Sequence, residues 1–212
     1  NRLLWQMPRR RLGAEAIRDT MLVVSGDLDP ARGGPSLGLE LKGNIKGAGG
    51  KVNPPNWGNK IPDYVKNRRS IYLPLKRERP VGELEILSTF DFPHPSEITG
   101  ARANTTVATQ ALFLMNAPFV KQQANKLAAR LVADEPDDER ARIARLYLLA
   151  VNRPAHPDEI ATALTFLDQC AHDLGPNSAD PKARSGAWTQ LCHPVPASNH
   201  PPATPRAGPE RP

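Results

Sequence analysis

Three arginines and one aspartate carry the side chains best suited to holding an anionic ligand. A guanidinium is planar and always charged, so it can hold a carboxylate, a sulfate or several backbone carbonyls in fixed geometry. The candidate ligand-binding residues are Arg68, Arg69, Asp91 and Arg102. An acidic sugar or a sulfate is the ligand class that suits them. We prefer the competing interpretation, in which the arginines pair with Asp91 or with Glu15 and stabilise the fold.

A second group of reactive side chains lies on a turn-rich segment that contains Asp91, His94, Ser96 and Glu97. These residue types allow acid and base chemistry. The members of a catalytic triad, however, normally converge from distant parts of a fold. We therefore predict no catalytic residue here and interpret the segment as a loop that is anchored by the phenylalanines on either side of Asp91.

Cysteine and histidine occur together twice near the end of the chain, as Cys170-Ala171-His172 and Cys192-His193. Adjacent Cys192 and His193 are awkwardly spaced for one tetrahedral zinc centre, so we predict no metal site. Neither cysteine lies in the Cys-x-x-Cys-His arrangement, which excludes covalent haem attachment within this chain. The two cysteines either form a disulfide in an exported protein or remain small buried hydrophobic residues.

A glycine cluster at residues 47–52 superficially resembles a phosphate-binding loop. Ile45 stands where that loop needs its first glycine, and Val52 replaces the hydroxyl residue that would contact magnesium. We predict a flexible loop instead.

Charge is distributed unevenly along the 212 residues. Residues 1–80 hold 16 Lys and Arg against 7 Asp and Glu, whereas the rest of the chain is slightly acidic. A basic surface can attract polyanions, but the basic residues are scattered and belong to no nucleic-acid reading motif, so we predict no nucleic-acid partner. No apolar run approaches the roughly 18 residues that a membrane span needs, so we predict none.

Hydrophobic periodicity predicts a mainly α fold with long Pro-rich and Gly-rich loops and one or two short strands. The best strand candidate is residues 70–75, because Ile71, Tyr72 and Leu73 favour strands. Helices are predicted over residues 12–25, 83–87, 107–133 with a break at Pro118, a segment capped by Asp137 or Asp138, 157–171 and 183–191.

The same periodicity predicts which helix faces are buried. In the first helix Ala16, Ile17, Met21 and Val24 should face inward, with Arg18 on the opposite side. The later helices should form an antiparallel hairpin at the end of the fold, and Trp188 should anchor the last one. We expect residues 1–192 to form one helical domain and residues 193–212, with seven prolines, to be disordered.

Several short phrases recur in an order that resembles one known family. They are Arg68-Arg69-Ser70-Ile71-Tyr72-Leu73, Phe90-Asp91-Phe92-Pro93-His94-Pro95, Thr105-Thr106-Val107-Ala108-Thr109-Gln110-Ala111-Leu112-Phe113-Leu114-Met115-Asn116 and Asn1-Arg2-Leu3-Leu4-Trp5. The chain is similar to the planctomycete-type C-terminal domain of unknown function fifteen fifty-three, over about residues 1–192. Because the chain begins with Asn1, we expect it to be a fragment or a processed product. The resemblance implies that it is the C-terminal part of a larger protein.

The resemblance implies an exported or periplasmic multidomain protein with an upstream domain, often of the cytochrome-c type. Haem would then belong to that upstream domain, and we predict no cofactor in this chain. The function that the resemblance favours is a non-catalytic interaction or scaffold module, with other domains of the same protein and polysaccharide as candidate partners. The alternative is part of a carbohydrate-active or electron-transfer-linked enzyme that acts on complex polysaccharide.

Overall fold

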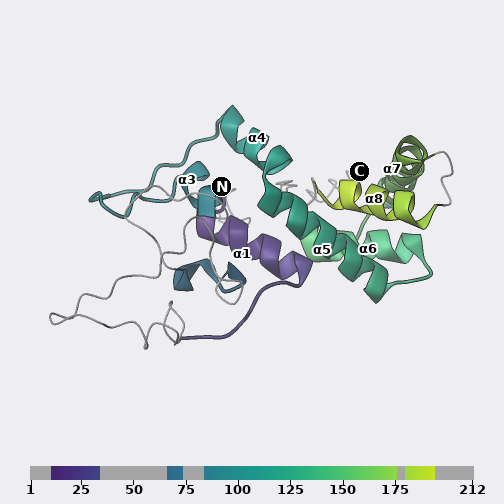
Figure 1. The fold of residues 1–212 in the computed structure, drawn as a ribbon, viewed down its shortest axis with the longest axis horizontal. Coiled ribbons are helices and arrows are strands. Elements are labelled where there is room, and N and C mark those ends of the chain that lie inside the picture. The colour runs from purple at the N-terminus through teal and green to yellow at the C-terminus, as the bar shows by residue number, and fades with distance from the viewer. Residues whose placement is uncertain (1–10, 34–65, 74–83, 176–179, 194–212) are drawn as a thin grey trace, which may run out of the picture. The chain divides into compact units, whose positions relative to one another are not determined.

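The computed structural model describes residues 11–33, 66–73, 84–175 and 180–193 (Figure 1). Within these residues it contains seven α-helices and one short 3-10 helix, which confirms the mainly α prediction. Their bounds are α1 Ala14–Ser25, η2 Ser70–Tyr72, α3 Glu85–Thr89, α4 Ala108–Asn116, α5 Pro118–Asp134, α6 Glu139–Val151, α7 Pro157–Leu174 and α8 Pro181–Cys192. The glycine cluster at 47–52 and the tail from residue 194 lie outside the described residues.

The chain forms two compact units. The first unit contains Leu12–Val23 and Asp27–Phe113, and the second contains Asn1–Arg11, Val24–Gly26 and Leu114–Pro212. α1 belongs to the first unit except for Val24 and Ser25, which belong to the second, where Val24 packs in the core and Ser25 donates a hydrogen bond to Gln123. The prediction that residues 1–192 fold as one domain stays a prediction.

The buried face of α1 differs from the predicted one. Arg18 has only 1% of its surface exposed and is the most unexpected member of the buried face. Met21 is buried as predicted, but Ala16 is exposed and Ile17 is only partly buried. The prediction failed because it placed every charged side chain in solvent, whereas Arg18 is buried among polar partners of its own.

The predicted strand over residues 70–75 is wrong in its described part. Ser70–Tyr72 forms a 3-10 turn, closed by hydrogen bonds from the Tyr72 and Leu73 amides to the Arg69 and Ser70 carbonyls. The described residues contain no strand, only one isolated bridge between Asp29 and Arg68. Strand propensity at Ile71 and Tyr72 stabilises a strand only when a neighbouring strand pairs with it, and the described residues offer none.

The predicted break near Pro118 is confirmed. Proline lacks an amide hydrogen and fits the first position of a helix, so α4 ends at Asn116 and α5 begins at Pro118. α4 is not a core helix, however, because only Gln110 of it is buried, whereas Leu112 and Met115 are 57% and 62% exposed. α5 buries the predicted stripe of Val120, Ala124, Leu127, Ala128 and Leu131.

Carboxylate side chains cap the starts of α6 and α7, and a left-handed residue ends α6. The Asp138 carboxylate accepts hydrogen bonds from the Arg140 and Ala141 amides at the start of α6, as predicted for an N-cap. α6 ends where Asn152 adopts a left-handed conformation, with a φ of 56°. At the start of α7 the Glu159 carboxylate accepts a hydrogen bond from the His156 amide at 2.8 Å.

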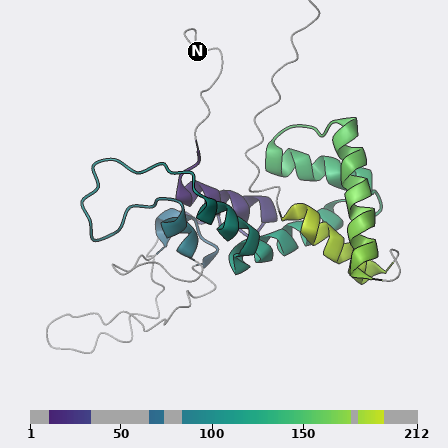
Figure 2. The same ribbon diagram turned by 90° about the horizontal axis from the view of Figure 1, so that it is seen from above.

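A short turn joins α6 to α7, but the two helices are not antiparallel. Figures 1 and 2 show α6 lying across α7 at a steep angle. The reason is that α7 packs most extensively on α8, and α8 in turn packs on α5, so α6 contributes only one side of the bundle. The prediction of two helices joined by a tight turn is confirmed, while their predicted antiparallel course is wrong.

The core of the second unit lies between α5, α6, α7 and α8. Trp188 is its largest member and is 1% exposed, which confirms its predicted anchoring role. Leu131, Ile143, Leu146 and Leu167 belong to the same core and are fully buried. In the part of the chain that the structure describes, no helix has the length and apolar character needed to cross a membrane.

Replacing Leu167 by alanine tests this core. The side chain is fully buried, so Leu167→Ala should lower the free energy of unfolding by about 2–5 kcal/mol through lost burial and a residual cavity. The matched control is Leu148→Ala on α6, where the leucine is 48% exposed and the expected loss is about 1 kcal/mol or less. Urea denaturation followed by far-ultraviolet circular dichroism measures both; equal losses would contradict this packing.

Candidate functional site

Arg18 organises the polar site of the first unit by donating to the segment 66–70. Its Nη1 donates to the Arg68 carbonyl at 3.0 Å and to Ser70 Oγ at 3.2 Å. Its Nη2 donates to the Lys66 carbonyl. One buried guanidinium therefore fixes the backbone that precedes η2 against α1.

The neighbouring carboxylate of Asp19 holds the same segment from a second direction. It accepts hydrogen bonds from the Ser70 amide at 2.8 Å and from the Ser70 hydroxyl at 2.7 Å. The Nε of Arg69 lies 3.7 Å from Asp19, and the Arg69 side chain is 55% exposed. The Arg69 side chain is therefore the candidate ligand-binding group of this segment that remains accessible to solvent.

Arg68 is turned toward the chain rather than toward an open site. Its guanidinium donates to the Gly33 carbonyl and lies 4.5 Å from the centre of the Tyr72 ring. Its backbone also forms the bridge to Asp29. The side chain thus holds a loop end and an aromatic ring together.

Arg102 pairs with the carboxylate that the sequence analysis named as one possible partner. Its Nη1 lies 2.8 Å and 3.0 Å from the two oxygens of Glu15, and its guanidinium is 5.4 Å from the centre of the Phe92 ring. The pair is substantially exposed, so it contributes little to stability, of the order of 0–1 kcal/mol.

Asp91 pairs with Thr105. Its carboxylate accepts from the Thr105 amide at 2.8 Å and from the Thr105 hydroxyl at 2.9 Å, which closes the loop of residues 92–104. Its φ of 61° places it in the left-handed region, which aspartate tolerates better than most residues. Gln110 supports the same junction by donating to the Thr89 carbonyl at 3.1 Å.

The acid and base residues near Asp91 do not converge into a triad. Two local hydrogen bonds link them, from the Ser96 amide to His94 Nδ1 at 3.3 Å and from the Glu97 amide to the His94 carbonyl at 3.0 Å, and the loop that carries them is largely exposed. Arg68 and Arg69 lie near Asp19 and Arg102 lies at Glu15, so α1 brings three of the four candidates to one helix. Their role as ligand-binding residues stays a prediction.

Sequence reasoning missed Arg18, Asp19 and Ser70 as the residues that hold this site. The signal for Arg18 was present, because residues 14, 18, 21 and 25 follow one helical stripe and the other three are small or apolar. All four are buried. A charged residue inside an otherwise buried stripe indicates a buried group with fixed partners.

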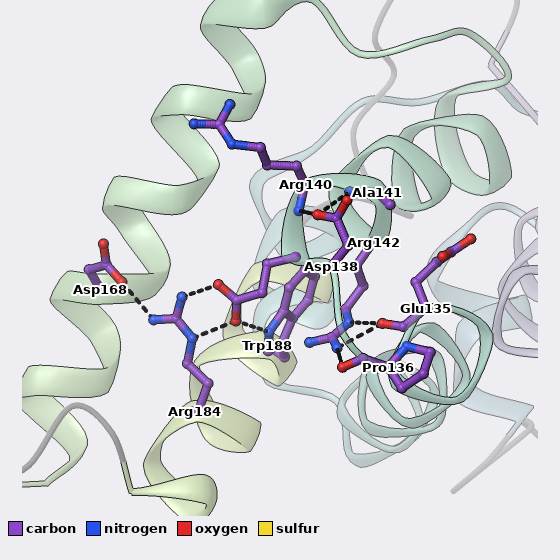
Figure 3. A network of polar contacts seen from close by, with 10 residues as sticks. Glu135, Pro136, Asp138, Arg140, Ala141, Arg142, Asp168, Arg184 and Trp188 are labelled. Carbon is purple, nitrogen blue, oxygen red and sulfur yellow. Dashed lines mark hydrogen bonds and ion pairs between the residues drawn. The ribbon is translucent and has the colours of Figure 1, made fainter.

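A second polar network stabilises the helical bundle (Figure 3). Arg184 of α8 donates through Nε to Glu139 at 2.7 Å and through Nη1 to Asp168 at 2.8 Å, which joins α6, α7 and α8. The Trp188 indole nitrogen lies 3.4 Å from the same Glu139 carboxylate. The Arg184 guanidinium lowers the pKa of Glu139, although partial burial opposes the shift.

Arg142 lies beside the same network, but its guanidinium donates hydrogen bonds to backbone carbonyls. It donates to the Glu135 carbonyl through Nε at 3.0 Å and Nη2 at 2.8 Å, and to the Pro136 carbonyl at 2.8 Å. Its guanidinium lies 4.9 Å from the Trp188 ring centre. Figure 3 shows this side chain between the end of α5 and the indole, so it satisfies terminal carbonyls while packing on the core.

A third pair lies at the turn between α6 and α7. Arg153 binds both oxygens of Glu159 at 2.6 Å and 2.8 Å, which is the bidentate arrangement that favours ionised partners. Hydrogen bonding from Arg153 lowers the pKa of Glu159 to about 2. Burial raises the pKa of Tyr147, and the negative charge of Glu159 adds to this increase.

The cysteines are both free thiols in this structure, and Cys192 is fully buried. Burial raises the pKa of the Cys192 thiol to about 12, which keeps it protonated and unreactive at neutral pH. Among the described residues, no group of three or more His, Cys, Asp or Glu side chains is arranged to hold a metal ion.

One comparison with known proteins gives a match. The model of a family described as "Protein of unknown function (DUF1553)" matches residues 1–167. The match ends within α7, so α8 and its contacts lie beyond it. No curated protein and no solved structure matches the chain.

Arg18→Met tests whether the buried guanidinium is structural. Methionine fills much of the same space but cannot donate, so the carbonyls of residues 66 and 68 lose their donor and the free energy of unfolding should fall by about 3 kcal/mol or more. Arg69→Ala is the matched control, with an expected loss below about 1 kcal/mol because its ion pair is exposed. Urea denaturation measures both, and an Arg18 variant as stable as the control would disprove the assignment.

The lowered pKa of Glu159 predicts an acid-sensitive second unit. A carboxyl whose pKa is about 2 when folded and 4.5 when unfolded stabilises the fold above pH 4.5, and that contribution is lost as the pH falls toward 2. Glu159→Gln should therefore show a flatter dependence of unfolding free energy on pH across this window. Denaturant titrations at several pH values measure it, with Glu97→Gln on the exposed loop as the control that should keep the wild-type slope.

Proposed function

Because the chain belongs to the family described as "Protein of unknown function (DUF1553)", we propose that it is a non-catalytic interaction or scaffold module of a larger exported multidomain protein. The observation that carries the proposal is that three of the four candidate ligand-binding residues already contact other groups of this chain. Arg68, Asp91 and Arg102 each contact groups of the chain itself and hold loops in place. Their hydrogen bonds therefore support a scaffold.

The electrostatics of the described carboxylates support the same proposal. Glu139 and Glu159 both have a lowered pKa, and in each case the largest cause is a hydrogen bond from an arginine. A general acid needs the opposite shift, which comes from burial without a cationic partner. These two carboxylates are suited to ion pairs that fix helices.

Export and an upstream companion domain, including one of the cytochrome-c type that would carry haem, are part of the proposal. They derive from the family resemblance, and other domains of the same protein are accordingly the first partners to test. Polysaccharide is the second, because the alternative function is part of a carbohydrate-active or electron-transfer-linked enzyme.

The proposal predicts binding without turnover. The purified 212-residue chain, mixed with the separately expressed upstream part of its own gene product, should form a stoichiometric complex in isothermal titration calorimetry. The same chain should release no reducing ends from a panel of neutral, acidic and sulfated polysaccharides. Release of reducing ends that disappears in Asp91→Asn but survives in Glu97→Gln, with both variants folded, would establish the enzyme alternative instead.

A further inference from the structure

An open groove runs along α7 in the second unit. It has a volume of about 450 Å³ and is lined by Tyr147 of α6, by Leu191 of α8 and by the α7 residues Asp158, Glu159, Thr162, Ala163 and Phe166. All three helices also contribute to the buried core that contains Trp188. The walls of the groove are therefore held by the bundle itself.

The groove has a polar end and an apolar end. Asp158, Thr162 and Phe166 follow one another at intervals of four residues, so they form a row along one side of α7. Two helical turns separate the first from the last, a rise of about 12 Å. Asp158 thus marks the acidic end, while Phe166, which is 37% exposed, marks the apolar end.

The acidic end carries one carboxylate, Asp158, without an ion pair among the described residues. The charge of Glu159 is balanced by Arg153, which binds both of its oxygens. The carboxylate of Asp158 forms no hydrogen bond or ion pair with another described residue, and its side chain lies at the exposed start of α7. The Tyr147 hydroxyl likewise donates to none of the described residues. A cationic group that entered here would meet an aspartate and a phenol oxygen.

The rest of the groove favours an apolar side chain over a sugar ring. Its lining includes the apolar side chains of Ala163, Phe166 and Leu191. The Thr162 hydroxyl already donates to the Asp158 carbonyl at 2.8 Å. Sugar recognition needs several polar partners around an open aromatic face, whereas this groove offers few such partners and a partly covered phenylalanine.

We propose that this groove is a docking site for a peptide segment of a partner protein or domain that carries a Lys or Arg about 12 Å from an apolar side chain. The basic side chain binds Asp158, and the apolar side chain packs on Phe166 and Leu191. This inference rests on the proposed interaction function and names the chemistry of one partner surface. Charge complementarity selects a basic segment, because an acidic one would be repelled by Asp158.

Selection from a random dodecapeptide phage library on the 212-residue chain tests the proposal. The enriched peptides should contain a basic residue followed or preceded by an apolar one, and synthetic fluorescein-labelled copies should bind in fluorescence anisotropy. Asp158→Asn and Phe166→Ala should each weaken that binding by about tenfold or more. Asp173→Asn, an exposed aspartate at the far end of the same helix, should leave it unchanged. Circular dichroism confirms that each variant is folded.

Charge reversal sharpens the test. Asp158→Lys should lose the basic peptides and select acidic ones. Enriched peptides without a basic residue, binding that ignores Asp158 and Phe166, or competition by cellohexaose in place of peptide would each overturn the groove assignment, as would a library that yields no binder. A complex with the upstream domain that persists in Asp158→Asn and Phe166→Ala would leave the scaffold function standing while removing this groove from it.

Discussion

Arginine side chains that donate to backbone carbonyls are the interaction on which the described structure depends. A chain with long irregular connections leaves carbonyls at helix ends and loop ends without partners, and each needs a donor when it is removed from water. Arg18 supplies donors to residues 66 and 68, Arg130 to Val24, and Arg142 to Glu135 and Pro136. One guanidinium with several N–H groups can satisfy two carbonyls at once.

The same interaction explains why the arginine-rich sequence is not by itself a sign of a polyanion partner. A guanidinium that is engaged with carbonyls or carboxylates has fewer N–H groups to offer a phosphate or sulfate. Arg142 and Arg184 in the bundle, and Arg18 and Arg68 in the first unit, are engaged in this way. Arg69, which is half exposed and only loosely paired with Asp19, differs from them in this respect.

The helices could be predicted from the sequence because their signals are local. Pro118 and Pro157 mark first turns, Asp138 marks a cap, and the stripe from Val120 to Leu131 follows the helical period. The 3-10 turn at Ser70–Tyr72 could not be predicted in this way, because its stability comes from Arg18 and Asp19, some fifty residues earlier. The crossing of α6 over α7 likewise reflects packing between distant segments, because α7 packs more extensively on α8 than on α6.

The candidate site shows the same division between local and distant causes. The residue types were predicted, and the pairing of Arg102 with Glu15 was among the alternatives, but the clamp between Asp91 and Thr105 depends on a loop conformation that no periodicity encodes. The groove on α7 was missed for a related reason. The spacing of Asp158, Thr162 and Phe166 along one side of α7 can be read from the sequence. These residues line a groove only together with Tyr147 of α6 and Leu191 of α8. A carboxylate without an arginine partner beside apolar side chains is a property of that assembly, and it sets Asp158 apart from Glu139 and Glu159, which arginines already bind.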